Sequence, residues 1–173
     1  MPNLRTAGMF LLIALVGVLL ATNFACADEN ISAPRALEGW RLPDVEGQWV
    51  DFSPQQAPGH RLLLFWATWC PYCKALMPHL ERFRRNNADR DIEFYALNIW
   101  EDSDPKAYVA KMDFNFRLIL DADNVAKRCS IKGTPGLVLV NQDNEVVYER
   151  RSGSPPEQVI TDLEFIVSNR KKP

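Results

Sequence analysis

The chain has 173 residues, of which 47% are hydrophobic, and its formal net charge at pH 7 is −2. This length suits one domain with a buried core, and the hydrophobic share is too high for a disordered chain. A charge so near zero gives no electrostatic reason to expect a nucleic acid or an anionic membrane surface as a partner. We therefore expect one globular domain that binds no nucleic acid.

Residues 1–27 have the pattern of a targeting segment. One cation, Arg5, precedes an unbroken apolar run over 9–21, and a small-residue cleavage site, Ala-Cys-Ala, ends at Ala27. The run is shorter than the ~20 residues of a membrane-spanning helix, so the pattern predicts a signal peptide. An uncleaved N-terminal membrane anchor and a lipoprotein attached through Cys26 are the alternatives. All three predict a periplasmic or otherwise exported protein.

The domain is predicted to begin after a polar tether. Residues 28–38 form this tether, and the remainder, 39–173, forms the domain. Residues 39–53 predict a β-hairpin that turns at Gly47. The apolar run 61–68 suits a central strand that is buried on both faces.

A helix is predicted to start at Pro71, because proline suits the first helical position. Apolar residues follow with helical spacing, and Pro78 lies inside the helix, where a kink is expected. A strand over 91–100 comes next. Acidic residues and a proline then mark the start of a helix over 102–113.

The remaining elements complete an alternating order. They are a strand over 116–121, a short helix over 122–131, two strands over 136–141 and 145–150, and a last helix over 155–170. Alternating strands and helices imply a mostly parallel sheet covered by helices, and the late hairpin adds antiparallel strands. We therefore expect an α/β fold with a central mixed sheet flanked by helices and an N-terminal β-hairpin extension.

Two of the four cysteines, Cys70 and Cys73, lie two residues apart at the start of the predicted helix. Dithiol exchange needs one exposed, acidic sulfur, and we expect it at Cys70, because unpaired N–H groups and the helix dipole there favour a thiolate. Cys73 lies one turn further on, within reach of the first sulfur, so the pair suits dithiol exchange. Cleavage after Ala27 would leave an odd Cys129, which we interpret as a small buried hydrophobe; a third redox cysteine is the alternative.

Competing interpretations of the pair are weaker. A zinc site needs two more ligands, and the chain offers only His60, His79 and the isolated Cys129. A copper site would also need a His or Met partner. A structural disulfide over so short a loop would remove little unfolded-state entropy. We therefore expect no metal and no cofactor other than the redox-active Cys70–Cys73 disulfide.

The stretch FWATWCPYCKALMP resembles the active site of the thioredoxin superfamily, and of its exported TlpA/ResA/CcmG-type branch in particular. LPDVEGQWVDFS resembles the N-terminal hairpin of that branch. IKGTPGLVLVNQDNEVVYERRSG resembles its cis-proline segment and the hairpin that follows. The resemblance covers about residues 40–170. It implies a thioredoxin fold and an enzyme in which Cys70 is the nucleophile and Cys73 resolves the mixed disulfide.

The resemblance also implies a substrate groove. Pro135 would be the cis proline facing the cysteine pair, and the Thr134 backbone would pair with an extended substrate chain. Trp69 would lie beside the sulfur. An ordinary loop proline and a core aromatic are the alternatives for these two side chains. The expected groove residues are Trp69, Pro71, Tyr72, Thr134 and Pro135.

Two positions depart from the family pattern. Leu64 occupies the place of a buried Asp found in many thioredoxins, and Leu76 that of a Glu common in the TlpA/ResA branch. Either carboxylate would take the proton of the buried thiol. Without them, Glu93, Glu101 or a water is the candidate acceptor for Cys73.

The resemblance implies a function in redox exchange outside the cytosol. It favours a reductant, with cytochrome c maturation among the roles of the branch. The partners would be disulfide-bearing or thiol-bearing exported proteins. A membrane electron-donor protein would have to re-reduce it. A disulfide-forming oxidant, a copper-delivering binding protein and a non-catalytic recognition module are the alternatives.

Overall fold

The computed structural model describes residues 35–55 and 59–169. The chain divides into a unit of residues 1–33 and a unit of residues 34–173, and every described residue belongs to the second. The predicted targeting segment over residues 1–27 therefore lies outside the described residues. Within these residues no helix combines the length and the apolar character needed to cross a membrane.

The domain begins with the predicted hairpin. Strand β1 (Trp40–Pro43) pairs antiparallel with β2 (Trp49–Phe52). Gly47 in the turn has a φ of 76°, a left-handed conformation that glycine adopts without steric cost. The N-terminal extension expected from the sequence is therefore confirmed. Residues 35–38, which we expected in the tether, also contact the domain, since Ala36 forms a bridge with Glu145.

Five further strands form one mixed sheet. They are β3 (His60–Trp66), β4 (Ile92–Asn98), β5 (Arg117–Ile119), β6 (Gly136–Val140) and β7 (Val146–Glu149). Their order is β5-β4-β3-β6-β7. Strands β3, β4 and β5 are parallel, whereas β6 runs antiparallel to β3 and β7 antiparallel to β6. All seven residues of β3 are buried, as its unbroken apolar run predicts.

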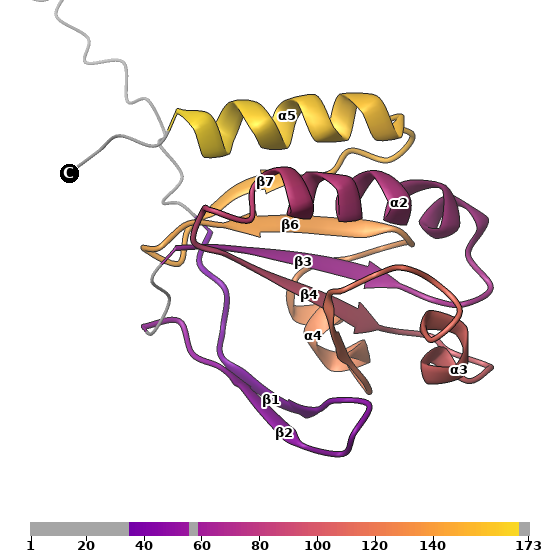
Figure 1. Cartoon of the computed structure of the whole chain (residues 1–173). Helices are drawn as coiled ribbons and strands as arrows, with labels where there is room; N and C mark the ends of the chain where they lie inside the picture. Colours follow the sequence, from indigo (N-terminus) through magenta and orange to yellow (C-terminus); the bar gives the residue numbers. More distant parts are fainter. Residues whose placement is uncertain (1–34, 56–58, 170–173) are drawn as a thin grey trace, which may run out of the picture. The chain divides into compact units, whose positions relative to one another are not determined.

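Helices cover both faces of this sheet. They are α2 (Pro71–Asn86), α3 (Pro105–Val109), α4 (Asp123–Arg128) and α5 (Pro156–Ser168). Figure 1 shows α2 and α5 on one face, α4 and the β1–β2 hairpin on the other, and α3 beyond the ends of β3 and β4. The expected α/β architecture is confirmed. Pro78 lies inside α2.

The alternation of side chains along β3 divides the core in two. Leu62 and Leu64 join the cluster beneath α2 and α5, which also contains Cys73. Leu63 joins the cluster beneath α4 and the hairpin, which contains Cys129. The cysteine pair and the third cysteine therefore lie on opposite faces of the sheet.

Several elements, α4 and β4 among them, are shorter than the sequence predicts, and two of the differences have a local cause. The helix expected over 102–113 is confined to α3, because the chain leaves the helical path at residues 110–112. The strand expected over 116–121 is confined to β5. Asp121 has a φ of 55°, and this left-handed conformation ends the extended strand.

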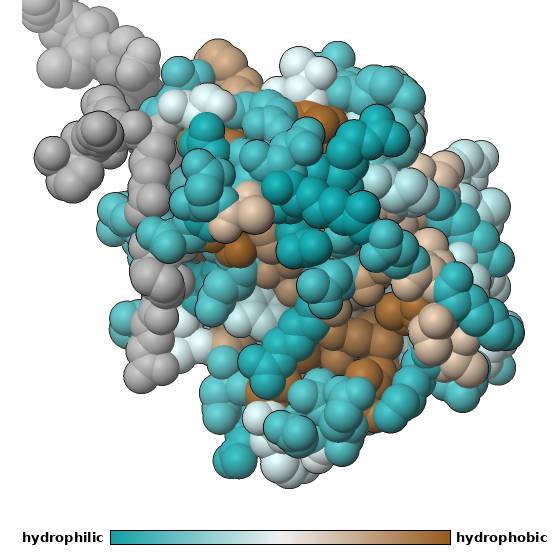
Figure 2. Space-filling view, in the orientation of Figure 1, coloured by the Kyte–Doolittle hydropathy of each residue, from teal (hydrophilic) through white to brown (hydrophobic). Residues whose placement is uncertain are grey.

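The surface is mainly polar. Figure 2 shows hydrophilic residues over most of the visible face and a hydrophobic area between the β1–β2 hairpin and α3. Among the described residues, the exposed large hydrophobic ones are Trp49, Trp69, Tyr72, Trp100, Val147 and Phe165. Trp69 precedes Cys70, Tyr72 lies between the two cysteines, and Trp100 follows the neighbouring strand β4, so three of these six belong to one end of the sheet.

Candidate active site

Cys70 is the N-cap of α2. The chain leaves β3 at Trp66 and turns, so that the Cys70 N–H donates to the carbonyl of Ala67 at 3.2 Å. The helix then begins at Pro71. The Cys70 Sγ accepts a hydrogen bond from the Cys73 N–H at 3.1 Å, one of the donors that a helix leaves unpaired in its first turn. A negative sulfur at Cys70 would gain from this bond and from the helix dipole.

Cys70 and Cys73 form a disulfide, with their Cα atoms 5.3 Å apart. This separation lies within the usual range for disulfides. The two residues are 1% and 0% exposed. We expected an exposed sulfur at Cys70, but the oxidised protein encloses both sulfurs, because Cys70 also packs in the core cluster beneath α2.

Exposed aromatic side chains flank the disulfide. Trp69 is 47% and Tyr72 72% exposed, so a core position for Trp69 does not fit. The Trp69 indole Nε1–H donates to the carbonyl of Trp100 at 2.8 Å. Trp100 has a φ of 51°, which is uncommon for a bulky residue, and its N–H donates to Asp123 at 3.1 Å. The loop after β4 therefore holds the Trp69 ring in place.

Glu101 fixes the loop that leads to Cys70. Its carboxylate accepts hydrogen bonds from the Thr68 N–H at 2.9 Å and the Thr68 hydroxyl at 2.6 Å. Three further donors are the Asn98 side-chain amide and the backbone N–H groups of Asp102 and Ser103. Thr68 itself is buried. One carboxylate thus connects the ends of the two neighbouring strands β3 and β4.

Neither glutamate suggested by the sequence is free to take the proton of Cys73. Burial opposes ionisation of Glu101, but hydrogen bonds, above all from Thr68, outweigh it and lower the pKa of this carboxyl. A carboxylate that already accepts several hydrogen bonds and whose pKa is lowered is a poor proton acceptor. Glu93 accepts a bond from the Tyr95 hydroxyl at 3.1 Å, and Tyr95 packs in the cluster on the other face of the sheet.

The surroundings of Cys73 are apolar. Leu64 and Leu76, the two positions at which the family resemblance led us to look for a carboxylate, are buried in the same cluster. Leu76 follows Cys73 by one helical turn, so the two side chains share a face of α2. Apolar surroundings disfavour a charged sulfur. Of the two cysteines, Cys70 is therefore the one whose position favours a thiolate.

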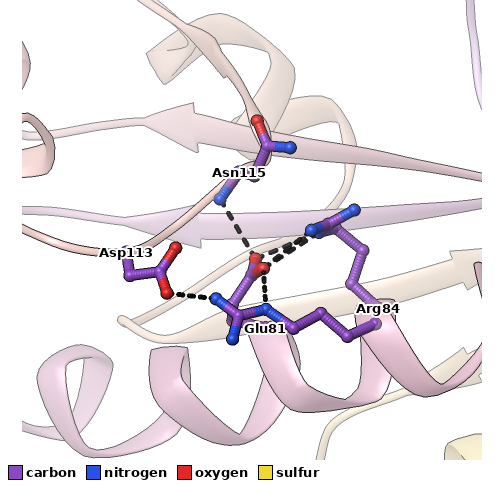
Figure 3. Close-up of polar contacts among 5 residues, drawn as sticks. Glu81, Arg84, Asp113 and Asn115 are labelled. Carbon is purple, nitrogen blue, oxygen red and sulfur yellow. Dashed lines mark hydrogen bonds and ion pairs between the residues drawn. The ribbon is translucent and has the colours of Figure 1, made fainter.

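An ionic cluster around the buried carboxylate of Glu81 fixes α2 further along its length (Figure 3). The side chain of Glu81 is 5% exposed and accepts bonds from Arg84 at 2.8 Å and Arg85 at 3.0 Å. It also accepts the backbone N–H of Asn115 at 3.0 Å, while Arg85 pairs with Asp113. Residues 113–115 precede β5, so this cluster attaches the helix that carries the cysteines to the neighbouring segment.

The Thr134–Pro135 segment lies at the same end of the sheet, and its peptide bond is cis. Strand β6 starts at Gly136, which is paired with Phe65 of β3. A Cβ at Gly136 would lie 2.8 Å from the side chain of Ile131, so glycine allows this close approach. The register brings Pro135 alongside the end of β3, where the loop toward α2 begins.

A pocket of about 480 Å³ separates the first turns of α2 from the Thr134–Pro135 segment. Three of the expected groove residues, Tyr72, Thr134 and Pro135, line it together. Trp69 lines a different pocket, on the side of α3. Pro71 is exposed at the first position of α2.

Sequence reasoning missed Arg150, which lines the same pocket. Its guanidinium donates to the carbonyl of Pro135 at 3.3 Å and to that of Ser154 at 2.8 Å. The predicted hairpin over 136–150 could have placed Arg150 near Pro135. Because β6 and β7 are antiparallel, a residue just after β7 must lie beside the residues just before β6.

Cys129 is buried on the other face of the sheet, at the end of α4. Burial raises the pKa of its thiol, which disfavours the reactive thiolate. This environment agrees with a small buried hydrophobe. In residues 35–55 and 59–169 no group of three or more His, Cys, Asp or Glu side chains is placed to hold a metal ion.

Comparisons with known proteins agree with this geometry. The chain is 26% identical to the thiol-disulfide oxidoreductase ResA of Halalkalibacterium halodurans, over 90% of this chain and 91% of that protein. The thioredoxin domain of a thiol-disulfide oxidoreductase from Bacteroides vulgatus superimposes with a TM-score of 0.65, at 18% identity, over 78% of this chain and 96% of that domain. A secreted disulfide oxidoreductase of Mycobacterium tuberculosis, homologous to Escherichia coli DsbE, gives a TM-score of 0.60 at 18% identity, over 73% of this chain and 95% of that one.

The family model for Redoxin matches residues 22–164, most of the chain. The solved structures share the thioredoxin fold. The ResA relative, which this chain matches over nearly its whole length, is a thiol–disulfide oxidoreductase. The resemblance to the TlpA/ResA/CcmG branch is therefore confirmed. A helix capped by one half of a cysteine disulfide is the feature that this class of enzyme requires, and the chain belongs to the Redoxin family as a ResA-like thiol–disulfide oxidoreductase.

Proposed function

We propose that this protein is an exported reductant that opens disulfides in other exported proteins by dithiol exchange. The observation that carries the proposal is the position of Cys70. Its sulfur accepts the Cys73 N–H at the start of α2 and is bonded to the Cys73 sulfur one turn away. One sulfur is thus placed to form a thiolate, and a second to resolve the product of its attack.

In the proposed reaction the reduced enzyme transfers two electrons. The Cys70 thiolate attacks one sulfur of the substrate disulfide, and the other substrate sulfur leaves as a thiolate and takes up a proton. The Cys73 thiol loses its proton to water, and its sulfur attacks Cys70 in the mixed disulfide. The second substrate thiolate leaves and is protonated. The enzyme ends with the Cys70–Cys73 disulfide, the state of this structure.

The substrate is proposed to bind as an extended chain beside Thr134. Tyr72, Thr134 and Pro135 line one pocket next to the cysteine pair, and an extended chain can pair with an exposed backbone edge. Trp69 and Pro71 would contact the substrate on the other side of Cys70. Both are exposed there.

The proposed direction is reduction, with cytochrome c maturation as one setting. A membrane electron-donor protein would return the enzyme to its dithiol form. Measurement of the reduction potential against a glutathione or dithiothreitol buffer tests the direction. A reduction potential of about −250 mV supports a reductant, whereas one of about −120 mV would identify a disulfide-forming oxidant.

Export is proposed from the charged, apolar and small-residue pattern of residues 1–27. A solved relative of the same fold is a secreted protein. Mass spectrometry of the protein purified from its native compartment tests the proposal. A mature N-terminus at Asp28 supports a signal peptide, and an intact N-terminus supports an anchor.

Cysteine trapping tests the exchange itself. A Cys73→Ala variant should accumulate mixed disulfides with its partners through Cys70, because no sulfur remains to resolve them. The matched control is Cys70→Ser, which keeps Cys73 but should trap nothing. Equal trapping by both variants, or none by either, would contradict the assigned roles.

A further inference from the structure

The pocket beside the cysteine pair carries one uncompensated charge. Among the described residues that line it, Arg150 is the only basic or acidic one. Apolar and hydroxyl-bearing residues such as Leu76, Ser152 and Pro155 make up much of the rest. A second pocket, of about 440 Å³, also has Arg150 in its wall. Arg150 therefore lines both pockets, and the second also has Lys132 and Glu149 in its wall.

The hydrogen-bonding capacity of Arg150 is only partly used. A guanidinium has five N–H donors, and among the described residues this one makes two bonds, to the carbonyls of Pro135 and Ser154. The Nε–H is enclosed and has no acceptor among these residues. Within the described part of the chain Arg150 forms no ion pair. The neighbouring acid, Glu149, pairs instead with Arg35 at 2.9 Å.

These features suit a carboxylate that comes from outside the protein. A guanidinium binds a carboxylate with two parallel hydrogen bonds, and the pair is stronger where water is partly excluded. Leaving an arginine donor enclosed without an acceptor is unfavourable, and a bound carboxylate would allow the guanidinium to reorient and use it. Arg150 already contacts Pro135, the residue next to the proposed substrate edge at Thr134.

We propose that Arg150 binds an acidic side chain of the substrate polypeptide, close in sequence to the cysteine that Cys70 attacks. This inference rests on the proposed function, because it names the class of substrate that the same site prefers. An extended chain paired with Thr134 directs every second side chain to one face. A side chain next to the reacting cysteine would then reach the pocket that Arg150 lines.

The test uses peptides that carry one cysteine blocked by a chromogenic aromatic thiol. Each peptide has Glu or Gln at a single position, either directly before or directly after the cysteine. Reduced full-length enzyme attacks the peptide sulfur, and release of the aromatic thiol is followed by absorbance. For at least one position we expect the second-order rate constant for release of the aromatic thiol, measured in a single turnover of the reduced enzyme, to be about tenfold higher with Glu than with Gln. This preference should decrease as salt is added.

Variants assign the preference to Arg150. Arg150→Gln should abolish it, and Arg150→Glu should favour peptides with Lys at that position. The matched control is Arg151→Gln, which removes the exposed neighbouring arginine and should keep the preference. An Arg150 variant also loses the hydrogen bond to Pro135, and a shift of Pro135 would slow the Glu and Gln peptides equally. The ratio of the two rates is unaffected by such a shift, so a change in this ratio reports recognition of the acidic side chain.

The outcomes separate this inference from the proposed function. Glu and Gln peptides that react within about twofold of each other at every position overturn the role of Arg150 and leave dithiol exchange intact. That role is overturned equally if Arg150→Gln keeps the preference or Arg151→Gln loses it. If no peptide reacts with the wild-type enzyme, dithiol exchange itself is overturned, and acidic recognition with it.

Discussion

The carboxylate of Glu101 holds Thr68 by both its backbone N–H and its hydroxyl, at 2.9 and 2.6 Å. Thr68 lies two residues before Cys70, so a residue that follows β4 fixes the loop that follows β3. The bond from Trp69 to the carbonyl of Trp100 connects the same two loops a second time. The position of the cysteine pair therefore depends on contacts between strand ends as well as on α2.

Replacement of Glu101 by Gln should destabilise the protein. The amide has one acceptor oxygen in place of two charged ones, and its NH₂ group would face donors of Thr68 or Asn98. Loss of charge-assisted bonds to partly buried groups predicts a decrease of about 2–4 kcal/mol in the free energy of unfolding. Denaturant unfolding of the oxidised protein at pH 7 measures it.

Asp102→Asn is the control for this variant. Asp102 is adjacent and exposed, and its side chain accepts only a hydroxyl bond from Ser103 among the described residues. We expect a change within about 0.5 kcal/mol. If Glu101→Gln were as mild as this control, the five hydrogen bonds to Glu101 would not contribute to stability as argued.

Stability should fall in acid partly through Glu81 (Figure 3). Burial opposes ionisation of Glu81, yet bonds from Arg84, the Asn115 N–H and Arg85 lower the pKa of this carboxyl below its usual value. A lowered folded-state pKa stabilises the protein above the unfolded value of about 4.3, and this contribution is lost as the pH falls through the folded value.

The Glu81→Gln variant isolates this contribution. At pH 7 it leaves Arg84 and the Asn115 N–H without their charged partner, and we expect a loss of about 2 kcal/mol in the free energy of unfolding. In stronger acid, toward about pH 2, the difference from wild type should shrink, because the wild-type carboxyl takes up a proton as the pH falls through its lowered folded-state value. Glu157→Gln, at an exposed position of α5, should change little at either pH. A difference that stayed constant between the two pH values would refute the titration of Glu81.

Local sequence patterns predicted the parts of the site that depend on neighbours in the chain. The apolar run of β3, the proline at position 71 and the cysteine spacing together place Cys70 at a helix start, and the structure has it there. The mixed sheet and the N-terminal hairpin follow from the alternation of elements and from a glycine turn. Each of these inferences uses a period or a cap, which is local information.

Contacts between distant residues were not predictable in the same way. Thr68 and Glu101 are 33 positions apart, and nothing in either segment indicates that the carboxylate is saturated by donors. The burial of Cys70 depends on the side chains packed beneath α2, and it differs from the exposed sulfur that its role suggested. The left-handed conformation of Asp121, which shortens β5, has no pattern in the sequence either.

Cys129→Ala should leave dithiol exchange and the reduction potential unchanged. Cys129 packs on the face of the sheet opposite to Cys70 and Cys73, so it has no route to either sulfur in the folded protein. Removal of one buried sulfur predicts a loss of about 1–2 kcal/mol in stability. Exchange kinetics and denaturant unfolding of the same preparation measure both quantities. A large fall in exchange rate without unfolding would instead identify Cys129 as a third redox residue.

The reduced enzyme should carry a thiolate at Cys70 near neutral pH. The same N–H that contacts the Cys70 sulfur in the oxidised state would stabilise its negative charge, and the apolar surroundings of Cys73 offer no such help. In a Cys73→Ala, Cys129→Ala background only Cys70 remains among the described cysteines. Its thiolate absorbs in the ultraviolet, so a pH titration needs no reagent to reach an enclosed sulfur. We expect half of the absorbance change below about pH 7.5, with Cys70→Ser in the same background as the blank. A transition near pH 8.5, as for the unfolded chain, would mean that the helix start does not lower the pKa of this sulfur. A high rate of exchange would then have to come from a reactive substrate disulfide and not from an activated Cys70.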